Sequence, residues 1–272
     1  MTDGEREGAF IATKEHRRFS EFADAVRKHR YIGLCFGPAG VGKTLSARRY
    51  AKWDVAEPLL IEWGPRQPSD AKVYAAIADT RTIFYTPTVC CPFRELRDGI
   101  AKLISRAGVC IDEHLHRDDL VRTGAQANPA ELLIVDEAER LSTAAVEHLR
   151  DIFDRTGMGV ILIGMPGIEK RLSRYPQLYS RVGFAHHYRP LQGDELTFVL
   201  TRHWRQLGLA LDEADFTDAQ AMASIARITG GNFRLLHRLF VQIGRILKIN
   251  GLSVITDDVV EAARSTLVIG AT

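Results

Sequence analysis

Residues 37–44 read Gly-Pro-Ala-Gly-Val-Gly-Lys-Thr, which fits the pattern G-x-x-x-x-G-K-[ST] of a phosphate-binding P-loop. An apolar, strand-like run over residues 31–36 leads into this stretch, and a helical pattern over residues 43–53 follows it. Glycines let the backbone approach a phosphate closely, and the helix N-terminus adds partial positive charge there. Lys43 supplies a point charge, and the Thr44 hydroxyl is a ligand for Mg²⁺. The sequence therefore predicts a site for the phosphates of a nucleotide.

We expect the nucleotide to contact the whole loop and the residue that follows it. The expected contacts are Gly37, Pro38, Ala39, Gly40, Val41, Gly42, Lys43, Thr44 and Leu45.

A second motif lies at residues 132–137, which read Leu-Leu-Ile-Val-Asp-Glu. Four consecutive apolar residues predict a strand buried on both faces, as in a parallel sheet. The two carboxylates follow at its carboxyl end, where open α/β sheets bind their ligands. The pattern is that of a Walker B motif, in which Asp136 holds Mg²⁺ and Glu137 orients the attacking water. The expected metal ligands are therefore Thr44 and Asp136.

Composition places the chain among ordinary globular proteins. It has 272 residues, of which 46% are hydrophobic and 26% charged, and its net charge is +2. No apolar run approaches the roughly 20 residues that span a bilayer, and residues 1–8 are polar, unlike a secretory signal. We therefore expect a cytoplasmic protein without membrane contact. The adjacent Cys90 and Cys91, and the pair His114 and His116, lack the further ligands that a zinc site needs.

The remaining pattern predicts an α/β half followed by helices only. Strands are expected at 82–86, 160–163 and within 178–188, and helices at 21–29, 71–78, 92–107, 142–156 and 168–174. Ser20, Ser142, Thr217 and Thr256 are expected to cap helices, and Pro58, Pro65 and Pro68 to interrupt the chain after the P-loop helix. The predicted division is a flexible tail (1–19), an α/β nucleotide-binding domain (20–191) and a helical lid (192–272).

Taken together, these motifs resemble an AAA+ ATPase over most of residues 20–267. The run Leu-Ile-Val-Asp-Glu-Ala-Glu-Arg-Leu (133–141), with Tyr-Thr-Pro-Thr-Val (85–89) and Gly-Gly-Asn-Phe-Arg-Leu-Leu (230–236), is similar to the TniB, TnsC and MuB group of transposition regulators. Secretion ATPases of the ExeA kind share the same core pattern. The resemblance implies a parallel sheet sandwiched by helices and followed by a small all-helical lid, with ATP and Mg²⁺ as cofactors.

The resemblance also implies two arginines that act on the transferred phosphoryl group, beside Glu137 as the catalytic carboxylate. Arg234 falls where a lid sensor arginine reaches the γ-phosphate, and Arg181 where an arginine finger reaches a neighbouring subunit's site. Arg171 and Arg174 are competing candidates for the finger.

One position departs from the family pattern. The end of the fourth strand usually supplies a polar sensor, and here Gly164-Met165 offers only a thioether, which is a poor hydrogen-bonding group. We therefore expect slow hydrolysis, suited to a timed switch.

The implied function is ATP-dependent regulation of transposition, in which a ring or helical filament assembles on duplex DNA. The assembly would recruit a transposase, and a TniQ-like target-selection protein is a further possible partner. Expected phosphate contacts lie between the second and third strands, at Arg94, Lys102, Arg106, Arg117 and Arg122. Two alternatives stay open at this point: a helicase loader of the IstB or DnaC kind, and an assembly ATPase of the ExeA kind that does not bind DNA.

Overall fold

A five-stranded parallel sheet organises the first part of the chain in the computed structural model, which describes residues 10–115 and 130–267. The strand order is β2-β3-β4-β1-β5, and every neighbouring pair is parallel. The strands are β1 (Ile32–Phe36), β2 (Thr82–Tyr85), β3 (Leu132–Val135), β4 (Gly159–Gly164) and β5 (Val182–His187). Parallel strands need crossover connections, and helices supply them here.

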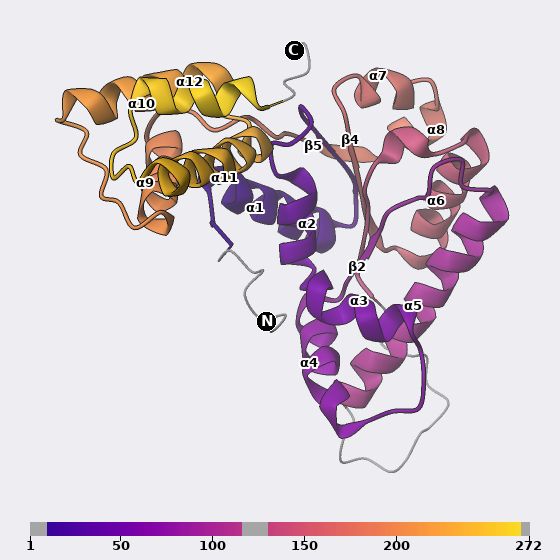
Figure 1. Ribbon diagram of the computed structural model, residues 1–272. Coiled ribbons are helices and arrows are strands. Elements are labelled where there is room, and N and C mark those ends of the chain that lie inside the picture. Colours follow the sequence, from indigo (N-terminus) through magenta and orange to yellow (C-terminus); the bar gives the residue numbers. More distant parts are fainter. Residues whose placement is uncertain (1–9, 116–129, 268–272) are drawn as a thin grey trace. The chain divides into compact units, whose positions relative to one another are not determined.

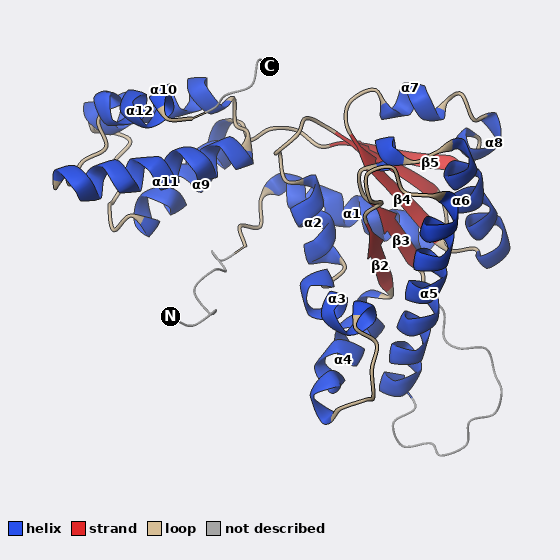
Figure 2. Ribbon diagram, turned by 45° about the vertical axis from the view of Figure 1, so that its right-hand side comes forward, coloured by secondary structure: helices blue, strands red, loops and turns tan. Residues whose placement is uncertain are grey.

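Helices cover both faces of this sheet, with α2 on one side and α6 on the other (Figure 2). The helices of this part are α1 (Lys14–His29), α2 (Lys43–Tyr50), α3 (Trp53–Ile61), α4 (Ala71–Thr80), α5 (Phe93–Leu115), α6 (Thr143–Thr156), α7 (Ile168–Leu172) and α8 (Pro176–Tyr179). Short 3-10 turns lie at Pro68–Asp70 and Ala138–Arg140. The predicted α/β class with a parallel sheet is therefore confirmed.

Four helices follow the sheet along the chain (Figure 1). They are α9 (Gly193–Gln206), α10 (Phe216–Thr229), α11 (Phe233–Asn250) and α12 (Asp257–Ser265). They share a core in which Trp204, Leu236 and Val260 are at most 1% exposed. These helices form their own apolar cluster, as expected of an amphipathic bundle.

Two compact units result from the pattern of contacts. One consists of residues 16–37 and 43–188 and holds the sheet; we call it the α/β unit. The other, the helical unit, consists of residues 189–272 together with 1–15 and the loop residues 38–42. The main division thus falls at Arg189, close to the boundary at residue 192 that the sequence predicts, but the middle of the P-loop belongs to the helical unit.

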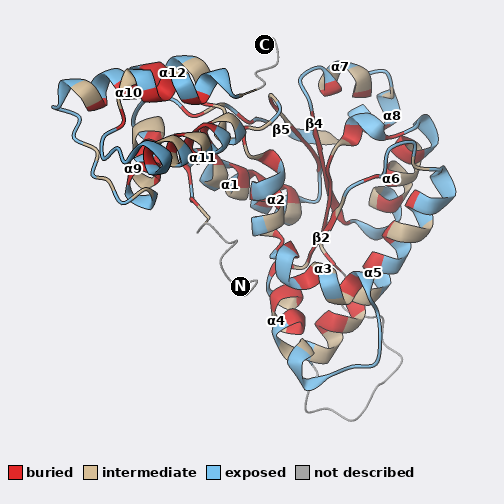
Figure 3. Ribbon diagram, in the orientation of Figure 1, coloured by how far each residue is buried: buried red, intermediate tan, exposed pale blue. Residues whose placement is uncertain are grey.

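Burial explains which elements the sequence predicts well. Strands β3 and β4 are buried along their whole length, whereas most residues of β5 at the sheet edge are exposed (Figure 3). A fully apolar run is typical of a central strand of a parallel sheet. The bounds of β1, β3 and β4 accordingly match the predicted runs to within one residue at each end.

Several predicted helix boundaries are wrong. Helix α1 begins at Lys14, before Ser20, because Phe19 is fully buried and the Ser20 hydroxyl donates to the His16 carbonyl within the helix. The helix thus occupies part of the segment 1–19 for which the sequence predicts a tail. Helix α10 is capped by Asp215, whose carboxylate accepts from two backbone N–H groups, and not by Thr217.

The third error concerns Pro58, which lies inside α3 instead of ending it. A proline removes only one backbone hydrogen bond, and α3 buries Trp53, Ala56 and Leu60 to 3% exposure or less. The gain from that burial outweighs the lost bond. Helix α5 also runs past its expected end at residue 107, to Leu115.

Candidate functional site

The carboxyl ends of β1 and β3 bring the two motifs together within the α/β unit. Both strands flank β4, and all three run in the same direction, so their carboxyl ends meet at one edge of the sheet. The Thr44 hydroxyl, in the first turn of α2, donates to Asp136 Oδ2 at 2.6 Å. Two residues 92 positions apart in the sequence are thus in direct contact.

Asp136 is almost fully buried, at 4% exposure. Its Oδ1 accepts the N–H of Glu137 at 2.9 Å, and its own N–H donates to the Tyr85 carbonyl at the same distance. Burial raises the pKa of Asp136 above its ordinary value, and the hydrogen bonds from Thr44 and Glu137 oppose that shift. A buried carboxylate beside a hydroxyl is a pair of hard oxygen ligands, so these two residues fit the Mg²⁺ ion of a nucleotide complex.

Lys43 begins α2 and is only 8% exposed. Its ammonium donates to the Gly37 carbonyl at 2.5 Å, so the charge lies against the start of the loop. Gly37 itself has no room for a side chain, because an added Cβ would lie 2.1 Å from the Tyr188 carbonyl oxygen. The chain therefore needs glycine at this position for packing against the segment after β5.

Tyr188 supports the loop from a position that sequence reasoning missed. It is 3% exposed; its N–H donates to the Phe36 carbonyl at 2.8 Å, and its hydroxyl pairs with Ser46 Oγ at 2.8 Å. These contacts connect the end of β5 to both ends of the strand–loop–helix segment within the α/β unit. No local pattern marks Tyr188, because its role arises only from the pairing of β5 with β1.

Glu137 adopts a left-handed backbone conformation, with φ of 48° and ψ of 45°. Non-glycine residues rarely adopt this conformation, and they concentrate at functional sites. Its carboxylate forms an ion pair with Arg140, whose guanidinium also donates to the Pro87 carbonyl at 2.9 Å. Arg140 thus holds the predicted catalytic carboxylate against the segment after β2, a contact that the sequence motif alone does not indicate.

The three finger candidates differ in their contacts. Arg181 forms a forked ion pair with Asp154, at 2.6 and 2.9 Å, and also donates to the Gln177 carbonyl. Arg171 donates to the carbonyls of Glu139 and Leu141. Arg174 is exposed and has no ion pair within the described residues. Arg174 is therefore the candidate that the α/β unit leaves available for an outside partner.

Most of the remaining nucleotide-binding candidates belong to the helical unit, which includes the loop residues 38–42. Gly40 has φ of 78° and Gly42 φ of 111°, so both need the freedom of glycine. Arg234 lies in the first turn of α11, and its backbone N–H donates to the Gly40 carbonyl at 2.9 Å. Leu45, in the α/β unit, is 52% exposed at the start of α2.

The expected DNA contacts divide into three groups. Arg94 is exposed and approaches Asp98 at 3.8 Å, while Lys102 is exposed without an ion pair in the described part of the chain. Arg106 has a structural role: it donates to the carbonyls of Leu60 and Ile61 and lies over the Trp63 ring. Arg117 and Arg122 lie outside the described residues.

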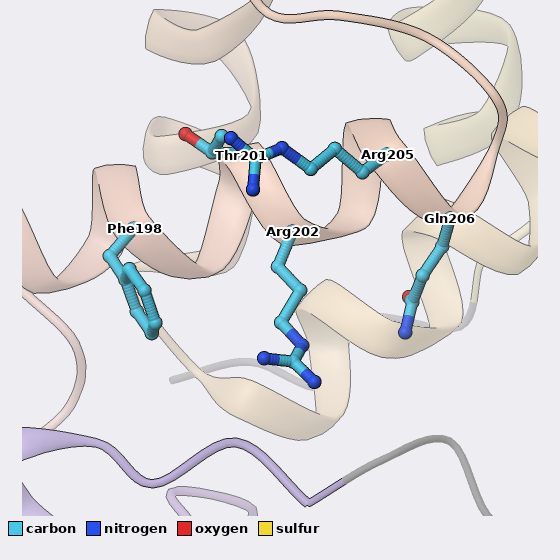
Figure 4. A pocket seen from close by; sticks show the side chains of 5 residues that line it. All are labelled: Phe198, Thr201, Arg202, Arg205 and Gln206. Atoms are coloured by element: carbon cyan, nitrogen blue, oxygen red, sulfur yellow. The ribbon is translucent and has the colours of Figure 1, made fainter.

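A separate pocket of about 530 Å³ lies in the helical unit (Figure 4). It is lined by one face of α9: Phe198, Thr201, Arg202, Arg205 and Gln206. None of these residues belongs to the predicted site. Arg202 and Arg205 have no ion pair with another described residue, so this face of α9 carries uncompensated positive charge.

Among the described residues, no group of three or more His, Cys, Asp or Glu side chains could hold a metal ion by itself. None of the helices in that part of the chain has both the length and the apolar character needed to cross a membrane.

The strand order, the loop after β1 and the carboxylates after β3 define a nucleotide-binding protein of the AAA+ class. The model of the AAA domain family matches residues 26–172, and the chain belongs to this family. It is 45% identical to a "Potential ATP-binding protein" of Staphylococcus aureus over 96% of this chain and 97% of that protein. It is 26% identical to the "Mu-like prophage FluMu DNA transposition protein B" of Haemophilus influenzae, over 85% and 71% of the two chains.

Solved structures agree on the fold. The RuvB Holliday junction branch migration motor of Thermotoga maritima superimposes with a TM-score of 0.56 at 19% identity, covering 93% of this chain and 68% of RuvB. The ORC2 protein of Aeropyrum pernix superimposes with a TM-score of 0.52 at 16% identity, covering 96% and 70%. At these identities the likeness establishes the AAA+ fold alone.

Proposed function

We propose that this protein is an ATPase that binds duplex DNA and regulates transposition. The observation that carries the ATPase proposal is the 2.6 Å contact between Thr44 and Asp136, which joins the P-loop to the Walker B carboxylate. The transposition part rests on the resemblance to the TniB, TnsC and MuB group and on the relative named DNA transposition protein B.

The residues divide the chemistry among themselves. Lys43 and the loop N–H groups would bind the phosphates, and Thr44 with Asp136 would hold the Mg²⁺ that neutralises phosphate charge. Glu137 would orient a water molecule for attack on the γ-phosphate and accept its proton. For this, the Glu137 carboxylate must leave its ion pair with Arg140.

The neighbouring subunit would complete the site. Charge that develops on the transferred phosphoryl group needs a fixed guanidinium, and the available Arg174 suits a finger that acts on another copy of the chain. Arg181 could serve only after releasing Asp154. Arg234 of α11 remains our proposed sensor arginine. Met165 after β4 provides no strong hydrogen-bonding group, so we propose slow turnover suited to a switch.

We propose that the bound nucleotide controls whether the protein assembles on DNA. ATP at subunit interfaces would favour a ring or filament around duplex DNA, and that assembly would present a surface to a transposase. DNA contacts would be made mainly with phosphates, so binding should depend steeply on salt and little on sequence.

Nucleotide binding and turnover test the ATPase proposal directly. Lys43→Ala should abolish binding of ATP and any ATP-dependent self-association. Glu137→Gln should keep binding but lower turnover by about a hundredfold or more, because the amide cannot accept the proton. Equal nucleotide affinity and equal self-association in wild type and Lys43→Ala would contradict the proposal.

Steady-state turnover with and without duplex DNA tests the switch. We expect slow hydrolysis that responds to DNA. Fast hydrolysis that is the same in both conditions would exclude a DNA-linked switch while leaving the ATPase assignment intact.

A further inference from the structure

The first turn of α11 is bonded directly to the phosphate-binding loop, within the helical unit. The side-chain amide of Asn232 donates from Nδ2 to the Ala39 carbonyl at 2.7 Å. One residue further along the loop, the Gly40 carbonyl accepts the backbone N–H of Arg234 at 2.9 Å. Two successive loop carbonyls are thus fixed by the start of one helix.

Asn232 performs a second task with its other side-chain atom. Its Oδ1 accepts the N–H groups of Arg234 at 3.1 Å and Leu235 at 3.2 Å, which caps α11. An asparagine amide offers both an acceptor oxygen and a donor NH₂ group, whereas aspartate at neutral pH offers only acceptors. Asparagine can therefore cap the helix and hold the loop carbonyl at the same time.

The orientation of a loop carbonyl fixes the orientation of the next N–H group. A peptide unit is planar and trans, so its C=O and N–H point in opposite directions. Holding the Ala39 carbonyl toward α11 therefore turns the Gly40 N–H away from α11, and holding the Gly40 carbonyl does the same for the Val41 N–H. A phosphate-binding loop needs its N–H groups turned toward the ligand.

The close approach at Gly40 shows how tightly this contact is packed. A Cβ added at Gly40 would lie 2.5 Å from Asn232 Oδ1 and 3.0 Å from the Arg234 Cβ. Gly40 also has φ of 78°, which disfavours any other residue. The glycine of the loop and the asparagine of the helix therefore depend on each other.

We propose that Asn232 is a positioning residue for nucleotide binding, which orients the Gly40 N–H group through the Ala39 carbonyl. This inference rests on the proposed nucleotide site and deepens it by one positioning residue, through contacts that lie within the helical unit. Because binding linkage is reciprocal, a bound nucleotide stabilises the contact between the loop and α11 to the same extent that the contact strengthens nucleotide binding.

The test separates capping from loop positioning. Asn232→Ser keeps a good helix cap but has a side chain too short to reach the Ala39 carbonyl. We expect its thermal unfolding midpoint to stay near that of wild type, while its affinity for a fluorescent ATP analogue with Mg²⁺ falls about fivefold to tenfold. Hydrogen exchange of the amides in residues 39–42 should be faster in the variant without nucleotide.

Thr256→Ala is the matched control. Thr256 caps α12 in the same unit, where its hydroxyl accepts the Val259 N–H. Its loss should lower the unfolding midpoint but leave nucleotide affinity and loop exchange unchanged. Asn232→Ser could destabilise the protein as much as Thr256→Ala does. In that case Asn232→Asp, which also keeps the cap, is compared with wild type by the same two measurements, nucleotide affinity and loop hydrogen exchange.

The outcomes distinguish this inference from the proposed function. If wild type binds the analogue, Lys43→Ala does not, and the Asn232 variants bind and exchange like wild type, then the positioning role is wrong and the nucleotide site stands. If Lys43→Ala binds as well as wild type, the nucleotide site is wrong, and the inference fails with it.

Discussion

Asp136 is a proposed Mg²⁺ ligand whose burial disfavours the ionised form of its carboxyl group. Its carboxylate is 4% exposed, and burial raises its pKa. A raised pKa in the folded state means that the neutral form is preferred, so stability from this group is present at low pH and is lost as pH rises through the folded pKa. At neutral pH the ionised carboxylate therefore opposes folding until a cation binds.

Asp136→Asn should consequently separate stability from binding. We expect the nucleotide-free variant to unfold at a higher temperature than wild type at pH 7 to 8, because a buried charge is removed while an oxygen remains for the Thr44 hydroxyl. The stabilisation that Mg²⁺ and ATP add to wild type should be largely absent. Differential scanning fluorimetry with and without the ligand measures both effects; a variant less stable than wild type without ligand would contradict this account.

The sequence predicts the residues of the P-loop and Walker B motif because each acts within a short segment of fixed geometry. It does not predict the roles of Tyr188, Arg140 or Asn232 in positioning these segments. Their contacts join residues far apart in the chain, apart from the short-range pair of Arg140 with Glu137. For Arg181, the position in the motif suggests an arginine finger, but the sequence does not show that its guanidinium pairs with Asp154 in the structure.

At the scale of elements, the local sequence pattern predicts a helix or strand correctly where one signal, such as an apolar run or a capping residue, is much stronger than the others. The apolar runs of β1, β3 and β4 and the caps of α6 and α12 are found where the sequence predicts them. The starts of α1 and α10 differ because burial of Phe19 and the carboxylate of Asp215 outweigh the apparent serine and threonine caps. Pro58 shows that packing of α3 outweighs a local helix breaker.

Helix α9 contains a buried histidine, His203, from which we expect a pH-dependent stability of the helical unit. His203 is 5% exposed and stacks on Phe240 of α11, with ring centroids 4.6 Å apart. Its Nδ1 pairs with Gln206, and its Nε2 has no hydrogen-bond partner among the described residues. Burial lowers the pKa of His203, and nearby His237 lowers it further, so the neutral ring is the form compatible with folding.

The sign of the pH effect follows from this lowered pKa. The stability that neutral His203 contributes is present above the unfolded pKa of about 6.5 and is lost as pH falls through that value toward the lower folded pKa. His203→Phe, which keeps an aromatic ring against Phe240, should reduce the loss of stability below about pH 6.5, by up to about 1.4 kcal/mol per pH unit. Urea unfolding at pH 5.5 and 7.5 measures the difference. Identical pH dependence in both proteins would assign the effect to other histidines, such as His16 and His148, whose pKa values burial also lowers.

At the scale of the whole molecule, the net charge of +2 does not by itself indicate DNA binding. Local charge is more informative, because contacts with phosphates need cations that are not already paired within the protein. Two candidate surfaces are Arg202 and Arg205 on α9, and Arg94 and Lys102 on α5, where Arg94 forms an exposed ion pair with Asp98 at 3.8 Å, a kind of contact that contributes little. Arg106 is excluded from the α5 surface, since its guanidinium holds the end of α3 and its loss should chiefly lower stability.

Salt dependence can decide which surface meets DNA. Each phosphate contact contributes about −0.9 to the slope of log affinity against log salt, so loss of two contacts should make the slope shallower by about 2. We expect this change in the double variant Arg94→Ala, Lys102→Ala, measured by fluorescence anisotropy with duplex DNA and a non-hydrolysable ATP analogue. The matched variant Arg202→Ala, Arg205→Ala removes the same charge from α9 and should leave the slope as in wild type. A changed slope only in the α9 variant would move the DNA surface to the helical unit, and a salt-insensitive affinity in the wild type would contradict phosphate binding altogether.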